Sequence, residues 1–185
     1  MKIKLILIFI LLCGLIHTPT NAQLSKIGGG IVLAKGGKFF YNDFEYYNSS
    51  FGVDIRGVFD VNSQFQIVPD FQLFLTNTFE YPAGGESNTT LFAFDLNGHF
   101  ILNPKRKFIF YLLGGFHLGG WNIKDYHEEY PEPVDYNDFV FDYGVNLGGG
   151  IQFKISRKFE LFAEIKYPVA KTHQTIFTPG IAYVF

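Results

Sequence analysis

Segments that alternate between apolar and other residues recur eight times along the chain, and they constrain its fold more than any other feature. In the clearest segment Phe51, Val53 and Ile55 share one face, and Asp54 and Arg56 share the other. Because successive side chains of a strand point to opposite faces, this period of two predicts β-strands with two unlike faces. We therefore expect eight strands, at residues 25–35, 49–60, 64–75, 90–101, 108–118, 139–153, 158–167 and 174–185.

The two faces of these strands differ in charge and in bulk. Sixteen of the 23 Phe residues lie on the more apolar face. The interior of an eight-stranded barrel is just wide enough to be filled by side chains, so this face does not fit inside and must point toward lipid. A soluble ligand-binding barrel, which would need it inside, is excluded. Away from the strand ends, the charged residues all lie on the other face: Asp54, Arg56, Asp70, Asp95, Asp142, Glu160, Glu164 and Lys166.

The connections between the strands alternate in length, apart from a brief last one at 168–173. Short periplasmic turns and longer extracellular loops are typical of membrane barrels. The sequence therefore predicts an all-β fold, an eight-stranded antiparallel up-and-down transmembrane β-barrel, whose first and last strands pair because lipid tolerates no open edge. Pro69 and Pro179 lie within strands, and we expect each to mark a bulge. The short links are 61–63, 102–107 and 154–157, and the long ones are 36–48, 76–89 and 119–138.

The start of the chain has the pattern of a cleaved signal peptide at residues 1–22. A basic start precedes an apolar run at 5–16, and Thr20 and Ala22 supply the small residues before the cleavage site. The run is shorter than the roughly 20 residues that a membrane-spanning helix needs. Cleavage would leave one barrel domain at 23–185, without cysteine and therefore stabilised by its sheet rather than by disulfides.

The last strand ends in a short pattern made by Thr178, Gly180, Tyr183 and Phe185. The pattern resembles the C-terminal signal by which the barrel assembly machinery recognises outer-membrane β-barrels for insertion. With the eight strands, it makes the whole of 23–185 resemble the OmpA/OmpX-type and PorT-like barrel domains of Gram-negative envelopes. This resemblance implies a place in the outer membrane, contact with its lipids, and a role in anchoring, adhesion or envelope maintenance. The resemblance assigns no catalytic or binding role to any particular residue.

The polar face predicts a network of charges in the lumen. If Phe59 pairs with Phe65 across the 61–63 turn, Asp54 lies opposite Asp70, and the next hairpin brings Asp95 beside Asp70. Carboxylates at one level repel each other and need counter-ions when buried. We expect Arg56 to contact Asp54 or Asp70, Lys166 to approach from across the barrel, and this network to plug the lumen.

The connection at 119–138 is the most distinctive candidate for an interaction surface. It holds six acidic residues against Lys124, together with Trp121, Tyr126, Tyr130 and Tyr136. Binding residues often lie on loops that a rigid scaffold positions. The acidic residues lack the ordered spacing of a Ca²⁺-binding loop, so we expect no metal and no cofactor.

These features favour a structural, adhesion or envelope-interaction protein that acts through its extracellular loops. No serine stands two residues from a histidine on one strand face, so we expect no catalytic residue, although a lipid-modifying enzyme stays an alternative. A narrow pore is the other alternative. Acidic residues outnumber basic ones, 17 to 15, which gives no reason to expect nucleic acid binding. We expect a monomer.

Overall fold

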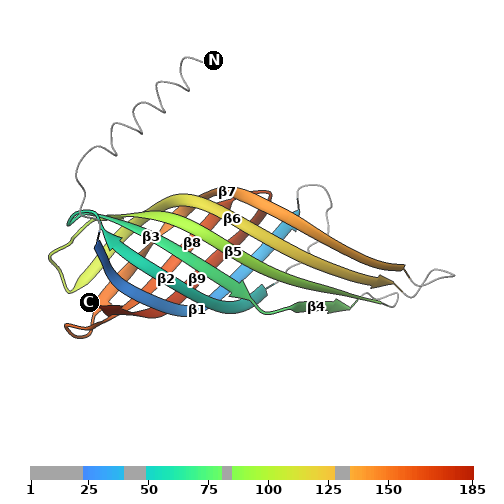
Figure 1. The fold of residues 1–185 in the computed structure, drawn as a ribbon, viewed down its shortest axis with the longest axis horizontal. Coiled ribbons are helices and arrows are strands. Elements are labelled where there is room, and N and C mark those ends of the chain that lie inside the picture. Colours follow the sequence, from blue (N-terminus) through green and yellow to red (C-terminus); the bar gives the residue numbers. More distant parts are fainter. Residues whose placement is uncertain (1–22, 40–48, 81–84, 128–133) are drawn as a thin grey trace, which may run out of the picture.

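The computed structural model describes residues 23–39, 49–80, 85–127 and 134–185 (Figure 1). The predicted signal peptide therefore lies outside the described residues. No helix that is long and apolar enough to cross a membrane occurs among them. The strands are β1 (Gln23–Phe39), β2 (Ser49–Asp60), β3 (Phe65–Phe74), β4 (Asn77–Glu80), β5 (Gly85–Ile101), β6 (Phe108–His127), β7 (Val134–Lys154), β8 (Phe159–Val169) and β9 (Thr172–Val184).

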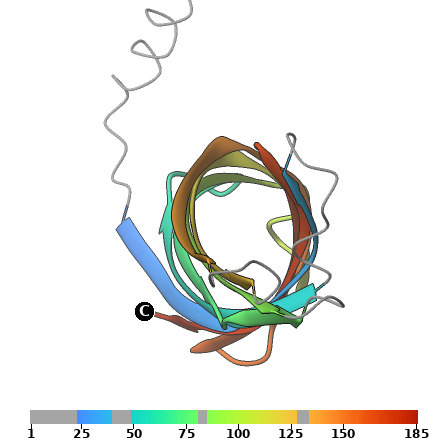
Figure 2. The ribbon, with the colours of Figure 1, turned by 90° about the vertical axis from the view of Figure 1, so that its right-hand side faces the viewer.

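The strands form one antiparallel sheet that closes on itself into a barrel (Figure 2). β3 and β4 both pair with β5, one after the other, so the two short strands occupy a single position and the barrel has eight. β1 pairs with β2 on one side and with β9 on the other, where Ile27 lies opposite Tyr183. The predicted fold class and the predicted pairing of the first and last strands are both confirmed.

The outer surface of the barrel is apolar and the interior is polar. Ile55 and Phe116 expose 60% and 69% of their surface on the outside, whereas Asp54 between its apolar neighbours exposes 2%. Aromatic rings gather where the strands meet the short turns: Phe108 packs on Phe153, and Phe159 packs edge-on against Tyr183. An apolar band bounded by an aromatic girdle fits a barrel immersed in a bilayer.

The two prolines inside strands do not produce the bulges expected of them. Arg56 faces Asp70 on one side of Pro69 and Phe59 faces Ile67 on the other, in the same register. Pro69 therefore opens the β2–β3 ladder locally without adding a residue, since a proline only removes a donor. The bulges on β1 lie elsewhere, between Leu24 and Lys26 and between Lys35 and Lys38.

Three strands continue well past the closed part of the barrel, toward the right of Figure 1. β6 and β7 stay paired as far as His127 and Val134, whereas β8 pairs with β7 only from Val145 onward. The predicted loops at 76–89 and 119–138 are thus largely β-structure. The outer parts of four strands form what we call the extracellular sheet, a name that follows the orientation predicted from the loop lengths: residues 77–80, 85–90, 122–127 and 134–139.

Candidate functional site

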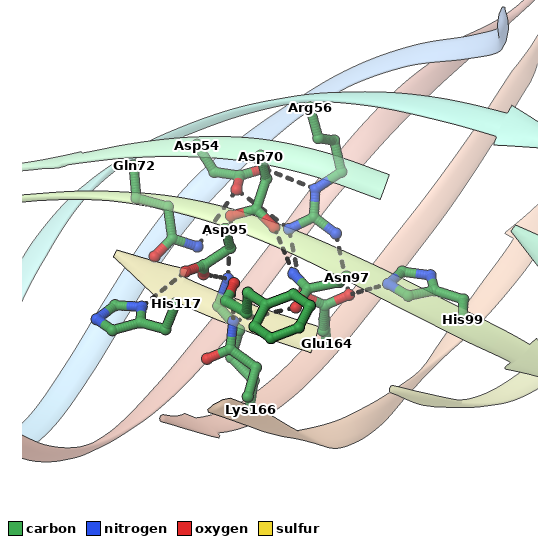
Figure 3. A network of polar contacts seen from close by, with 12 residues as sticks. Asp54, Arg56, Asp70, Gln72, Asp95, Asn97, His99, His117, Glu164 and Lys166 are labelled. Atoms are coloured by element: carbon green, nitrogen blue, oxygen red, sulfur yellow. Dashed lines mark hydrogen bonds and ion pairs between the residues drawn. The ribbon is translucent and has the colours of Figure 1, made fainter. Parts of the chain in front are cut away.

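Charged side chains form a network in the lumen, which we call the middle layer because an apolar layer and a cavity lie on either side of it (Figure 3). Asp70 on β3 and Asp95 on β5 face each other in the ladder. Lys166 on β8 reaches them from across the lumen: its Nζ donates to Asp70 Oδ1 at 3.0 Å and also to Asp95 Oδ2. One ammonium group thus offsets the repulsion between two adjacent carboxylates.

Arg56 on β2 links a second pair of carboxylates. Its Nε donates to Asp54 at 2.8 Å, and its Nη1 donates to Glu164 on β8 at 3.1 Å. The guanidinium also stacks on the Phe162 ring, 4.3 Å from the ring centroid. A planar guanidinium suits this position because it donates to two carboxylates in its plane while an aromatic ring covers its face.

Further polar side chains add hydrogen bonds to the middle layer. Tyr111 donates to Glu164 at 2.9 Å and stacks on His99, and Asn97 donates to Asp70 at 2.8 Å. His117 Nδ1 lies 2.6 Å from Asp95 Oδ1. His99 Nε2 lies 3.4 Å from Glu164 Oε2, so the nearest acidic partner of each histidine is a lumen carboxylate.

The structure brings together the five residues expected in the network, Asp54, Arg56, Asp70, Asp95 and Lys166, but in a different register. Arg56, not Asp54, faces Asp70, and Asp54 faces Gln72. The expected pairing of Phe59 with Phe65 is wrong because the turn is longer: Asn62 Oδ1 accepts from the backbone N–H of Gln64 and of Phe65. Such an Asx turn adds residues that an alternation pattern does not reveal.

The polar parity of His99 and His117 favours side chains that fill the lumen, and both are buried there. Sequence reasoning missed Glu164 as the partner of Arg56 and missed the supporting side chains Tyr111 and Asn97. These three also lie on the polar parity of their strands, so the alternation marks them as lumen residues. It does not tell which of them meet, because partners on β2, β6 and β8 depend on the stagger of a closed barrel.

An apolar layer fills the extracellular side of the lumen. Trp121 is fully buried there and packs with Phe74 and Leu91. The expectation that Trp121 belongs to a loop surface is therefore wrong: β6 continues through it, and its parity points it inward. Tyr126 is exposed on the extracellular sheet, while Tyr130 and the side chain of Tyr136 lie outside the described residues. The whole layer comprises Val32, Ala34, Phe74, Leu91, Trp121, Ile123 and Ile176.

The periplasmic end of the lumen is a cavity of about 740 Å³, and polar side chains close its inner end. Lys26 Nζ pairs with Glu160 at 2.6 Å and donates to Gln152 at 3.3 Å. Ile101 and Ile109 line one wall. The cavity ends below the middle layer, where Gln66 and Gln152 are hydrogen-bonded to each other.

The four residues of the C-terminal pattern occupy different environments on β9. Thr178 is buried in the lumen, and Phe185 lies outside with 70% of its surface exposed. Tyr183 packs edge-on against Phe159 and Phe185 in the girdle. A Cβ atom on Gly180 would overlap the Phe162 ring, so this position has a packing reason to lack a side chain.

Comparison with solved structures shows the same fold in several bacterial proteins. The attachment invasion locus protein Ail of Yersinia pestis, in complex with the heparin analogue sucrose octasulfate, is 15% identical, with a TM-score of 0.60 over 88% of this chain and 100% of Ail. Neisserial surface protein A is 12% identical, with a TM-score of 0.64 over 89% and 99%. Outer membrane protein OprG of Pseudomonas aeruginosa is 8% identical, with a TM-score of 0.60 over 91% and 99%. No protein-family model and no curated protein matches the sequence.

A closed sheet, a lipid-facing exterior and an interior whose middle layer is a network of polar side chains together define an outer-membrane β-barrel protein. Within that class the chain has the small, eight-stranded fold shared with Ail and Neisserial surface protein A.

Proposed function

We propose that this protein is a non-enzymatic interaction protein of the outer membrane, that it acts as a monomer, and that the extracellular sheet is its working surface. The observation that carries the proposal is the continuation of β5, β6 and β7 beyond the closed barrel. A ladder that extends so far outside the bilayer does not serve to anchor the chain. It supports instead a rigid platform for contacts at the cell surface.

The filled lumen favours this role over a pore. The apolar layer around Trp121 and the charge network below it lie in series along the barrel axis. An eight-stranded barrel has little interior space beyond its side chains. The proposal therefore expects no ion conductance in planar bilayers, and stepwise channel openings would favour the pore instead.

The lumen histidines also favour a role without catalysis. His117 lies against Asp95 and His99 against Glu164, which are contacts that fill and fix the interior. A hydrolase would need a histidine that activates a serine beside the membrane boundary. We accordingly assign no substrate and no cofactor.

Charge indicates which partners the sheet accepts. Residues 119–138 carry six carboxylates against Lys124, and Glu80 and Glu86 are exposed on the neighbouring strands. Ail was solved with a heparin analogue, a polyanion. An acidic surface repels such a ligand, so we propose a partner with a basic surface for this chain.

Shortening one hairpin tests the proposal. Ile123 and Asp138 are paired, so replacing 124–137 with Asn-Gly joins β6 to β7 through a two-residue turn and leaves the barrel ladder intact. We expect the shortened protein to fold and to keep its heat-modifiable migration. In zwitterionic nanodiscs, we expect the full chain to bind oligo-lysine in a salt-sensitive way and the shortened protein to lose that binding. Equal binding by both forms, or preferential binding of heparin by the full chain, would reject this function.

A further inference from the structure

The turns at the periplasmic end of the barrel carry a strong and one-sided positive charge. The β5–β6 turn and the β7–β8 turn contain no acidic residue, and neither does the β2–β3 turn. The two basic turns are neighbours, since the Lys154 N–H donates to the Lys107 carbonyl oxygen at 3.2 Å. Six exposed side chains, which we call the basic patch, supply the charge: Lys105, Arg106, Lys107, Lys154, Arg157 and Lys158.

An apolar groove of about 620 Å³ lies on the outer wall of the same sector of the barrel. Its floor is low because Gly29, Ala163 and Pro179 present little or no side chain on the outer face of β1, β8 and β9. Larger side chains, among them Ile31, Leu161 and Ile181, rise beside it and are about half exposed. The remaining outer positions of the barrel are mostly large, so the groove interrupts an otherwise bulky surface.

The groove begins at the basic patch. One row of directly paired outer residues runs across five strands, from Phe108 through Phe153, Leu161 and Ile181 to Gly29. Phe108 follows the β5–β6 turn at once, whereas Gly29 lies well inside β1. Because barrel strands are tilted, this row rises from the periplasmic boundary toward the middle of the bilayer.

Lys107 joins the two features. Its Nζ lies 5.0 Å from the centroid of the Phe153 ring, and Phe153 is itself a wall of the groove. A cation thus lies at the periplasmic end of the apolar groove, at the level of the aromatic girdle. This is where the headgroup of a lipid lies when its acyl chain follows the barrel wall.

We propose that this sector is a binding site for an anionic phospholipid of the periplasmic leaflet. The phosphate and its negative headgroup contact the basic patch, and one acyl chain lies in the groove over Ala163 and Pro179. The occupant is a lipid rather than an acidic protein because the charges adjoin a lipid-facing apolar groove that suits an acyl chain. The extracellular sheet, which is acidic, offers no equivalent attraction.

Native mass spectrometry of the protein purified from membranes tests the site. The protein is exchanged into detergent micelles with equal amounts of phosphatidylglycerol and phosphatidylcholine that carry the same acyl chains. We expect the first retained lipid to be phosphatidylglycerol, with a preference of about tenfold, since each basic side chain near the surface contributes roughly a fivefold attraction to anionic lipid before screening.

Two sets of variants separate headgroup from chain. A triple variant of the basic patch should abolish the preference for phosphatidylglycerol; it combines Arg106→Gln, Lys107→Gln and Lys158→Gln. A control triple variant at the extracellular end should preserve the preference; it combines Lys35→Gln, Lys124→Gln and Lys171→Gln. Ala163→Leu fills the groove and should lower retention of both lipids about fifteenfold, an effect on the order of two lost CH₂ contacts. Val53→Leu, on the outer face of β2, is the control for Ala163→Leu. If Ala163→Leu does not fold, Ala163→Val takes its place.

Several results would overturn the proposal. Equal loss of preference in the extracellular control shows a general charge effect. Unchanged retention in both Ala163 variants, or displacement by glycerol phosphate alone, shows an adventitious anion contact without an acyl-chain site. Binding of oligo-glutamate through the basic patch, with no preference between the two lipids, assigns the patch to an acidic macromolecule instead.

Discussion

Arg56 donates to carboxylates from two sides of the lumen, Asp54 on its own strand and Glu164 on β8. All three side chains are buried. Taking away the cation leaves two carboxylates without their shared partner, which costs far more than the pair itself contributes. We expect Arg56→Leu to lower the free energy of unfolding by about 3–5 kcal/mol. Urea titration of the refolded barrel in vesicles, followed by heat-modifiable migration, measures it.

A matched variant removes the charges together. Asp54→Asn, Arg56→Leu and Glu164→Gln in one chain leave no orphaned charge, so the combined cost should be smaller than that of Arg56→Leu alone. An Arg56→Leu protein that unfolds at the wild-type urea concentration would show that water or neighbouring side chains already solvate these carboxylates.

Gly180 faces the Phe162 ring so closely that a Cβ atom would overlap it. Phe162 in turn covers the guanidinium of Arg56. We expect Gly180→Val to destabilise the barrel by about 1–3 kcal/mol through overpacking. The double variant Gly180→Val, Phe162→Ala should recover part of that loss in the same urea titration. If the loss of unfolding free energy in the double variant equals the sum of the losses in the two single variants, Gly180 is required for another reason.

At the scale of strands, the alternation in the sequence predicted which elements exist and which face of each meets lipid. It did so because every outward position must be apolar in a bilayer, a requirement that leaves a period of two in the residues themselves. The ends of β6 and β7 were not predictable in this way. Beyond Gly120 and Phe139 the outward positions become polar, as at Asn122, Lys124 and Asn137, so the outer face no longer shows the apolar pattern of a lipid-facing strand.

The register between strands was predicted only in part. Asp70 and Asp95 face each other as expected, but β2 and β3 are shifted by two residues from the expected pairing. A shift of two keeps every side chain on its face, so hydrophobic patterning cannot detect it. The observed register goes with the hydrogen bonds of the 61–65 turn, in which Asn62 takes part.

The last strand makes a testable contribution to assembly. Phe185 exposes its ring to lipid, packs that ring edge-on against Tyr183, and donates its backbone N–H to the Ser25 carbonyl oxygen at 3.0 Å, so its removal takes one ring contact and one hydrogen bond from the folded barrel. We nevertheless expect deletion of Phe185 to reduce the protein in the outer membrane and to leave it degraded or trapped in the periplasm, because the C-terminal pattern resembles an insertion signal. Fractionated cells analysed by heat-modifiable migration give the answer. Normal levels of folded barrel would contradict this role.

Closure of the whole barrel rests on the pairing of β1 with β9. Ile27 and Tyr183 are directly opposite on the outer face. We expect Ile27→Cys with Tyr183→Cys to form a disulfide in membranes under mild oxidation, because cross-strand Cβ atoms lie about 4.5–5.5 Å apart. Ile27→Cys with Phe159→Cys is the control, since Phe159 is one strand further away and faces Tyr183. We expect only the variant with cysteines at 27 and 183 to change its gel migration on reduction. Cross-linking in the control as well would indicate that the barrel opens.

The continuous β6–β7 ladder, from Phe108 and Phe153 at the periplasmic turns to His127 and Val134 outside, also has a mechanical consequence. A partner that pulls the extracellular sheet away from the cell applies force along the strands. Force in that direction shears the ladders that join β6 to β5 and β7 to β8 within the barrel, so many hydrogen bonds share the strain at once, whereas force across the strands would unzip them one after another. The part of the molecule that meets the outside is therefore tethered to the membrane in its mechanically strongest direction, without a linker that would yield first.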